Sequence, residues 1–172
     1  PLDLNGQKIV ITCGGTTEAI DTVRSISNHA SGMSGHVMAN MAQFFGATVT
    51  LIRTNHHPLL EAIITLTVTN HQSLEHALMP LSNTCDKLIM NAAVSDFTVT
   101  PSKTKLNRGE FESLILTPTN DILKEFNQKK SPQCKSIGFC LHERDDLIET
   151  AKRKRMDKHC DVMIANDPSS FG

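Results

Sequence analysis

Short apolar, β-branched runs alternate along the chain with stretches whose apolar residues recur at helical spacing. Residues 8–13 form a compact apolar run that ends at Gly14-Gly15, which is typical of a buried strand. In residues 31–45, Met33, Val37 and Met41 recur every fourth position and Gly46 follows, which predicts a helix with a glycine after its end. Short apolar runs predict further strands at 47–52, 63–68, 86–91, 114–116, 136–140 and 161–165. Helical patterns predict further helices at 73–81, 121–128 and 144–156.

Strands separated by helices of this length indicate right-handed crossovers between parallel strands. We therefore expect an α/β fold of the Rossmann-like type, with three α/β/α layers and a mostly parallel sheet. The 172 residues favour a single domain over residues 1–172. Residues 94–112 and the residues just after Gly15 show no regular pattern and are expected to be loops.

Charge and composition narrow the possible functions. Lys and Arg number 17 against 18 Asp and Glu, a net charge of −1, which disfavours binding to nucleic acid or to a membrane surface. The chain has no apolar run near 18 residues and no basic segment followed by an apolar one at its start, so we expect a cytoplasmic protein. The five scattered cysteines lack a C-x-x-C pair and are expected to be reduced, buried side chains rather than zinc ligands. Because tyrosine is absent, the chemistry of short-chain dehydrogenases, which needs a Tyr proton donor, is excluded.

Small and polar residues follow several of the predicted strands. In parallel sheets ligands bind beyond the carboxyl ends of the strands, so these positions predict a site. Ser31 and Gly32 begin the first helix, where free N–H groups could hold a phosphate or simply be capped. Arg53 stands where an NAD-binding protein would carry an acidic residue. The positions in question are 14–17, Arg53, 92–96, Phe139 and 166–167.

Six ordered motifs, within a match that runs from Ile9 to Asp167, resemble those of the phosphopantothenoylcysteine synthetases. They are GGTTEAIDTVRSISNHASG, NAAVSDF, Lys103-Thr-Lys105, NDIL, IGF, and Lys154 with Lys158 before DVMIAND. The resemblance implies a ligase of coenzyme A biosynthesis that uses CTP in bacteria and ATP in eukaryotes. In that reaction the carboxylate of 4′-phosphopantothenate attacks the α-phosphorus and pyrophosphate leaves. The amine of L-cysteine then attacks the acyl-nucleotide, and the nucleoside monophosphate leaves.

The resemblance also implies Mg²⁺ with the CTP, and a homodimer in which the partner contributes to the phosphopantothenate pocket. Residues 1–172 would then be one ligase domain, with a shortened C-terminal segment and without the flavin-dependent decarboxylase domain of many bacterial relatives.

Residue roles follow from the same resemblance. Asn28 would be catalytic, because its amide can donate to the acyl oxygen, and Lys103 would meet the triphosphate, with Lys105 beside it. The backbone of Met90, Asn91 and Ala92 would contact the base. The remaining nucleotide contacts would be Asp96, Asn120, Asp121, Ile122, Leu123, Phe139, Lys154 and Lys158, with Gly14, Gly15, Thr16, Ser31 and Gly32 as phosphate-loop candidates and no side chain assigned to a metal.

Without the resemblance, plainer interpretations stay open. Asn28 could be a turn residue, Asp96 a turn or capping carboxylate, Lys103 a solvated surface lysine and Phe139 a core residue. At the level of the whole chain, the alternatives are a non-catalytic nucleotide-binding module and an oxidoreductase that binds NADP through Arg53. The family commonly has proline where this chain has Asn120.

Overall fold

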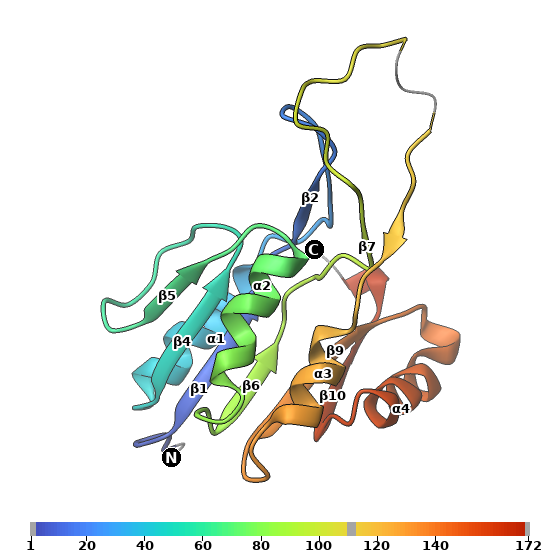
Figure 1. Ribbon diagram of the computed structural model, residues 1–172. Helices are drawn as coiled ribbons and strands as arrows, with labels where there is room; N and C mark the ends of the chain where they lie inside the picture. Colours follow the sequence, from blue (N-terminus) through green and yellow to red (C-terminus); the bar gives the residue numbers. More distant parts are fainter. Residues whose placement is uncertain (1–2, 110–112, 171–172) are drawn as a thin grey trace.

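The computed structural model describes residues 3–109 and 113–170 and has a six-stranded sheet at its centre (Figure 1). Every pair of neighbouring strands is parallel, which confirms the predicted α/β fold with a parallel sheet. In spatial order the strands are β10 (Val162–Asn166), β9 (Lys135–Leu141), β6 (Lys87–Met90), β1 (Lys8–Cys13), β4 (Thr48–Arg53) and β5 (Ile64–Thr67).

Helices cover both faces of this sheet, because side chains of the central strands alternate between two apolar clusters. On one face, Ile9 and Ile11 pack with α1 (Met33–Phe44). On the other face, Val10 and Leu88 pack with α2 (His71–Leu78) and α3 (Ile122–Lys129). The last helix, α4 (Leu147–Asp157), lies beside α3. These are the three predicted layers (Figure 1).

The cysteines are buried in the core and free, as predicted. Cys85 and Cys134 lie together in the cluster around Phe126, and burial raises the pKa of the Cys85 thiol to about 12. A thiol with such a pKa stays protonated at neutral pH and behaves as a small apolar side chain. Across residues 3–109 and 113–170, none of the helices is both long and apolar enough to span a bilayer.

Two short antiparallel pairs lie where loops were expected. One joins β2 (Thr17–Ala19) to β3 (Ser25–Ser27), and the other joins β7 (Phe97–Thr98) to β8 (Thr117–Pro118). Asp21 holds the first turn by accepting the backbone N–H groups of Val23 and Arg24. This hairpin and the described residues of the segment between β7 and β8 project from the body of the molecule (Figure 1).

The strand predicted at 114–116 is wrong. Those residues have no regular structure, and Ile115 and Leu116 are 80% and 46% exposed, so most of the apolar run that suggested a strand is not packed into the body of the protein. The short strand begins one residue later, at Thr117, where Thr98 lies opposite it.

Two predicted helices are shared between α-helix and 3₁₀ turns. The Asn70–Ser73 capping box starts α2 at His71, before the predicted start, and Pro80 lies in the 3₁₀ turn η1 (Met79–Leu81). In the helix predicted at 144–156, the first residues form the 3₁₀ turn η2 (Arg144–Asp146), and α4 follows it. A last 3₁₀ turn, η3 (Pro168–Ser170), follows β10.

Asp161 ties the beginnings of β9 and β10 to the end of α3. Its carboxylate accepts the Ser136 N–H at 2.9 Å, the Lys130 ammonium at 2.5 Å and the Lys135 ammonium at 3.0 Å. Burial acts to raise the pKa of Asp161, but these donors outweigh it and hold the pKa well below the ordinary value of 3.8. A carboxyl with a depressed pKa stabilises the fold above its unfolded pKa and loses that contribution as the pH falls.

We therefore expect Asp161→Asn to lower the free energy of unfolding at pH 7 by about 1–3 kcal/mol, measured by urea denaturation. The difference from the wild type should shrink between pH 7 and pH 3, because the unfolded wild type takes up a proton in that interval. Asp157→Asn is the matched control, since the Asp157 side chain is 62% exposed against 27% for Asp161 and its one ion pair among the described residues is with Lys124. An equal difference at both pH values would contradict the role of the Asp161 carboxylate.

Candidate functional site

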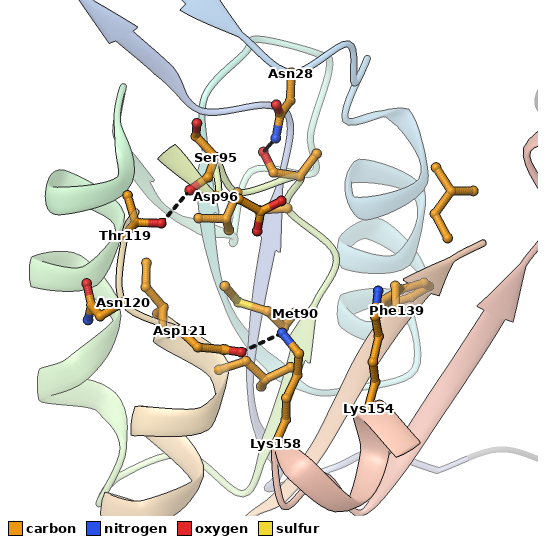
Figure 2. A pocket seen from close by; sticks show the side chains of 16 residues that line it. Asn28, Met90, Ser95, Asp96, Thr119, Asn120, Asp121, Phe139, Lys154 and Lys158 are labelled. Carbon is orange, nitrogen blue, oxygen red and sulfur yellow. Dashed lines mark hydrogen bonds and ion pairs between the residues drawn. The ribbon is translucent and has the colours of Figure 1, made fainter. Parts of the chain in front are cut away.

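A cavity of about 540 Å³ opens at the carboxyl edge of the sheet, between α3, α4 and the segment that follows β6 (Figure 2). This is where a parallel sheet binds its ligands. It is lined by Asn28, Met90, Ala92, Ala93, Val94, Ser95, Asp96, Thr119, Asn120, Asp121, Ile122, Leu123, Phe139, Leu141, Lys154 and Lys158.

Most of the residues predicted to bind a nucleotide meet in this cavity, although they come from positions 28 to 158 of the chain. The residues that were predicted and that line it are Asn28, Met90, Ala92, Asp96, Asn120, Asp121, Ile122, Leu123, Phe139, Lys154 and Lys158. The carboxyl ends of parallel strands lie at one edge, which explains why residues so far apart in sequence converge.

The Asn28 side chain is held at the rim of the cavity (Figure 2). Its Nδ2 donates to the Ala93 carbonyl at 3.1 Å, and its backbone N–H donates to the Thr16 carbonyl at 3.3 Å. A Cβ atom on Gly15 would lie 2.2 Å from the Asn28 carbonyl oxygen, so only glycine permits this close approach. Because a primary amide carries two N–H groups, Asn28 has a second donor for a ligand.

The carboxylate of Asp96 faces the cavity from a fixed stretch of backbone. Ser95 N–H donates to the Thr16 hydroxyl at 2.8 Å, and the Thr119 N–H donates to the Asp96 carbonyl at 3.0 Å. The Thr119 hydroxyl also donates to the Ser95 carbonyl at 2.8 Å. No hydrogen bond or ion pair within the described residues engages the Asp96 carboxylate, so its oxygens are available to accept hydroxyl groups of a ligand.

Cations from α4 and from Lys158, the residue that caps its C-terminal end, lie opposite this carboxylate. The Lys158 ammonium is 2.7 Å from Oδ2 of Asp121, while Oδ1 of Asp121 accepts the Lys124 N–H as the cap of α3. Lys154 lies one turn earlier on α4 and also lines the cavity. Apolar side chains of Met90, Ile122, Leu123 and Phe139 complete the lining. Apolar surface for a base, a carboxylate for a ribose and ammonium groups for phosphates together suit a nucleotide.

Several predicted residues are not brought to the cavity. Lys103 and Lys105 lie on the exposed segment between β7 and β8, and neither lines the cavity. Asn91 is not among the lining residues either. Its side chain lies against α1, where its Oδ1 atom would be 3.3 Å from a Cβ atom on Gly35. The phosphate-loop candidates Gly14, Gly15, Thr16, Ser31 and Gly32 do not line it either.

Neighbouring side chains explain why the phosphate-loop candidates lie apart. A Cβ on Gly14 would be 2.1 Å from the Thr54 hydroxyl, and a Cβ on Gly32 would be 2.5 Å from Oδ1 of Asn55, so the loop after β4 occupies the space against both glycines. Arg53, on which the NADP alternative depends, donates to the His57 carbonyl at 3.4 Å. Neither observation favours a dinucleotide at the start of α1.

Thr119 and Leu141 also line the cavity and were not predicted from the sequence. Thr119 acts by fixing the backbone of Ser95 and Asp96, and a threonine between proline and asparagine carries no pattern that reveals this. Leu141 was missed because β9 continues one residue past the predicted end.

Comparisons with known proteins point to one family. Residues 4–172 match the family described as the DNA/pantothenate metabolism flavoprotein C-terminal domain. A protein of an unknown prokaryotic organism, named cysteine/cysteine sulfinic acid decarboxylase, is 38% identical over 98% of this chain and 49% of its own length. The coenzyme A biosynthesis bifunctional protein CoaBC of Bacillus subtilis is 36% identical over 98% of this chain and 42% of its own length.

A solved structure agrees with this assignment. The crystal structure of the C-terminal domain of a bifunctional CoaBC superposes with a TM-score of 0.81 and 29% identity, over 92% of this chain and 76% of that one. The present chain spans about half the length of the curated relatives it matches.

Proposed function

The chain belongs to the family of the DNA/pantothenate metabolism flavoprotein C-terminal domain, and from this premise we propose that it joins 4′-phosphopantothenate to L-cysteine at the expense of CTP. The proposal rests above all on one arrangement, in which the Asn28 amide, the free Asp96 carboxylate and the Lys154 and Lys158 ammonium groups line the same cavity. The bifunctional coenzyme A proteins among its relatives support the choice of reaction.

The reaction needs no nucleophile from the protein. In the first half, a carboxylate oxygen of 4′-phosphopantothenate bonds to the α-phosphorus of CTP, and the bond to pyrophosphate breaks. In the second half, the cysteine amine bonds to the acyl carbon, CMP leaves with the bonding electrons, and the amine loses a proton. The protein's tasks are to align the reactants, neutralise phosphate charge and stabilise the oxygen of the acyl group.

The lining residues suit these tasks. Asp96 would accept the ribose hydroxyls, and the apolar surface around Met90 and Phe139 would hold the cytosine. Lys154 and Lys158 would meet phosphate oxygens, and the second N–H of Asn28 would donate to the acyl oxygen in both halves. An amide donor carries no charge. Unlike a cationic side chain, Asn28 would therefore neither repel a protonated cysteine amine nor form an ion pair with the carboxylate that must attack.

Mg²⁺ would accompany the triphosphate and neutralise part of its charge. Within the described residues, no group of three or more His, Cys, Asp or Glu side chains is placed to hold a metal ion. This lining suits a magnesium ion held mainly by phosphate oxygens and water, which is how Mg²⁺ commonly binds with nucleotides.

We also propose that the active form is a homodimer located in the cytoplasm. The projecting segments carry exposed apolar side chains, with Val23 at 67% and Ile115 at 80% exposure, and a second copy would cover such surface. Lys103 lies on one of these segments, away from its own cavity, so we place it at the phosphates of the partner's site. Light scattering at micromolar concentration should give twice the chain mass; a monomer that turns over fully would contradict this part.

Pyrophosphate release tests the proposed function. The purified chain is incubated with Mg²⁺, 4′-phosphopantothenate and L-cysteine together with CTP or ATP, one at a time, and a separate incubation with NADPH is followed by oxidation of the nicotinamide. Release that requires both CTP and 4′-phosphopantothenate supports the ligase. Binding of CTP without release would favour a non-catalytic nucleotide-binding module, and release with ATP alone would overturn the choice of nucleotide.

A further inference from the structure

A buried pair, Glu18 and His71, lies outside the cavity and connects its walls. Both residues are only 5% exposed. The Glu18 carboxylate accepts the His71 backbone N–H at 2.8 Å through Oε1 and the Thr98 hydroxyl at 2.8 Å through Oε2. His71 is the first residue of α2, so Glu18 satisfies one of the N–H groups that the start of a helix leaves free.

The ring of His71 reaches the cavity wall from behind. Its Nε2 lies 2.8 Å from the backbone carbonyl oxygen of Asn120. A carbonyl oxygen can only accept, so Nε2 must carry the proton and the ring acts as a donor. The contact fixes both the tautomer and the orientation of the imidazole.

These contacts converge on two walls of the nucleotide cavity. Thr98 follows Asp96 by two residues on one wall, and Asn120 immediately precedes Asp121 on the other. The Asn120 side chain also links α2 to α3. Its Nδ2 donates to the Glu75 carboxylate of α2 at 2.9 Å and to the Glu125 carboxylate of α3. The turn that begins α3 is therefore held against α2 by backbone and side chain together.

We propose that His71 is a positioning residue for this cavity, holding the Asn120–Asp121 turn so that Asp121 and its partner Lys158 face the nucleotide phosphates. This inference depends on the proposed function, because it names what the cavity holds. His71 itself does not line the cavity and touches no reacting atom. Losing its donor would leave the Asn120 carbonyl without that partner and would free the turn to move.

Two substitutions separate positioning from simple packing. His71→Leu removes the donor and keeps an apolar side chain, whereas His71→Gln can place an N–H close to the position of Nε2. We expect His71→Leu to raise the KM for CTP about tenfold with kcat and the KM for cysteine within a factor of two, and His71→Gln to restore most of the CTP affinity. His76→Leu, at an exposed position of the same helix, is the matched control and should change neither constant.

A nitrogen NMR spectrum of the imidazoles provides a readout that does not depend on activity. The wild type should show His71 as the Nε2–H tautomer, protected from exchange. An unprotected or Nδ1–H ring would overturn the inference, as would an unchanged KM for CTP in His71→Leu. An equal rise in the KM for CTP and the KM for cysteine in His71→Leu, which His71→Gln fails to reverse, would also overturn the inference. Failure of the ligase itself would appear separately, as a wild type that shows this tautomer and binds CTP but releases no pyrophosphate.

Discussion

Replacing Asn28 with aspartate is expected to lower kcat by about 10²–10³-fold and to make the acyl-nucleotide accumulate. In the native chain the Asn28 amide donates to the Ala93 carbonyl at 3.1 Å, and because Asn28 lines the cavity, its second N–H is available to a ligand. Aspartate has almost the same shape, but its ionised carboxylate has no donor. It would repel both the Ala93 carbonyl and the phosphate oxygens of the bound nucleotide.

The second half of the reaction should suffer most. In the proposed mechanism the first half would also be driven by the charge of Lys154 and Lys158, whereas the oxygen that becomes negative when cysteine attacks would depend on the Asn28 donor. Chemical quench with labelled CTP measures both halves, since pyrophosphate reports the first and CMP the second. We expect a burst of pyrophosphate with slow release of CMP.

The matched control is Asn83→Asp, which makes the same chemical change at an exposed turn away from the cavity. It should turn over at the wild-type rate. Normal turnover in Asn28→Asp would remove Asn28 from the mechanism, and equal loss of both halves would place its role in binding rather than in the second step.

The parallel sheet could be predicted because its strands are short apolar runs separated by helical patterns. Strands β1 and β4 carry buried apolar side chains on both faces, such as Ile11 and Leu51 on one and Val10 and Ile52 on the other, because helices cover both sides of the centre of the sheet. That topology also made the position of the site predictable, since it places the residues after β1, β6 and β9 at one edge. The roles proposed for Asn28 and Lys158 came from the resemblance to the family motifs, because spacing alone gives an asparagine in a loop and a lysine near the end of a helix.

The projecting parts could not be predicted from local pattern. The β2–β3 hairpin is polar and short, and it depends on contacts such as Leu106 N–H to Asp21, which joins residues 85 positions apart. The strand predicted at 114–116 failed for the opposite reason, because Ile115 and Leu116 are apolar yet exposed. The His71 contact was hidden for another reason: its acceptor is a backbone carbonyl, which any residue at position 120 would offer.

Removing the Lys158 ammonium should weaken nucleotide binding strongly. We expect Lys158→Met to raise the KM for CTP about 10–100-fold, the effect of losing a hydrogen bond to a charged group of roughly 1.5–3 kcal/mol. Lys158 lies 2.7 Å from Asp121, and its side chain is only 28% exposed, so its charge is poorly screened by water. Methionine retains much of the length of the side chain, and the exposed Lys152→Met on the same helix is the control, with no expected change.

Part of this effect should come from Asp121, whose carboxylate would face the phosphates without its partner. Asp121→Asn isolates that part, because asparagine caps a helix as well as aspartate and so keeps the start of α3 in place. We expect Asp121→Asn alone to bind CTP at least as tightly as the wild type, since Lys158 is then free to pair with phosphate. The double variant should be less impaired than Lys158→Met, because no unpaired carboxylate remains. A KM within twofold of the wild type in Lys158→Met would show that the phosphates do not lie at this end of the cavity. A large loss in Asp121→Asn would mean that the nucleotide contacts the carboxylate itself.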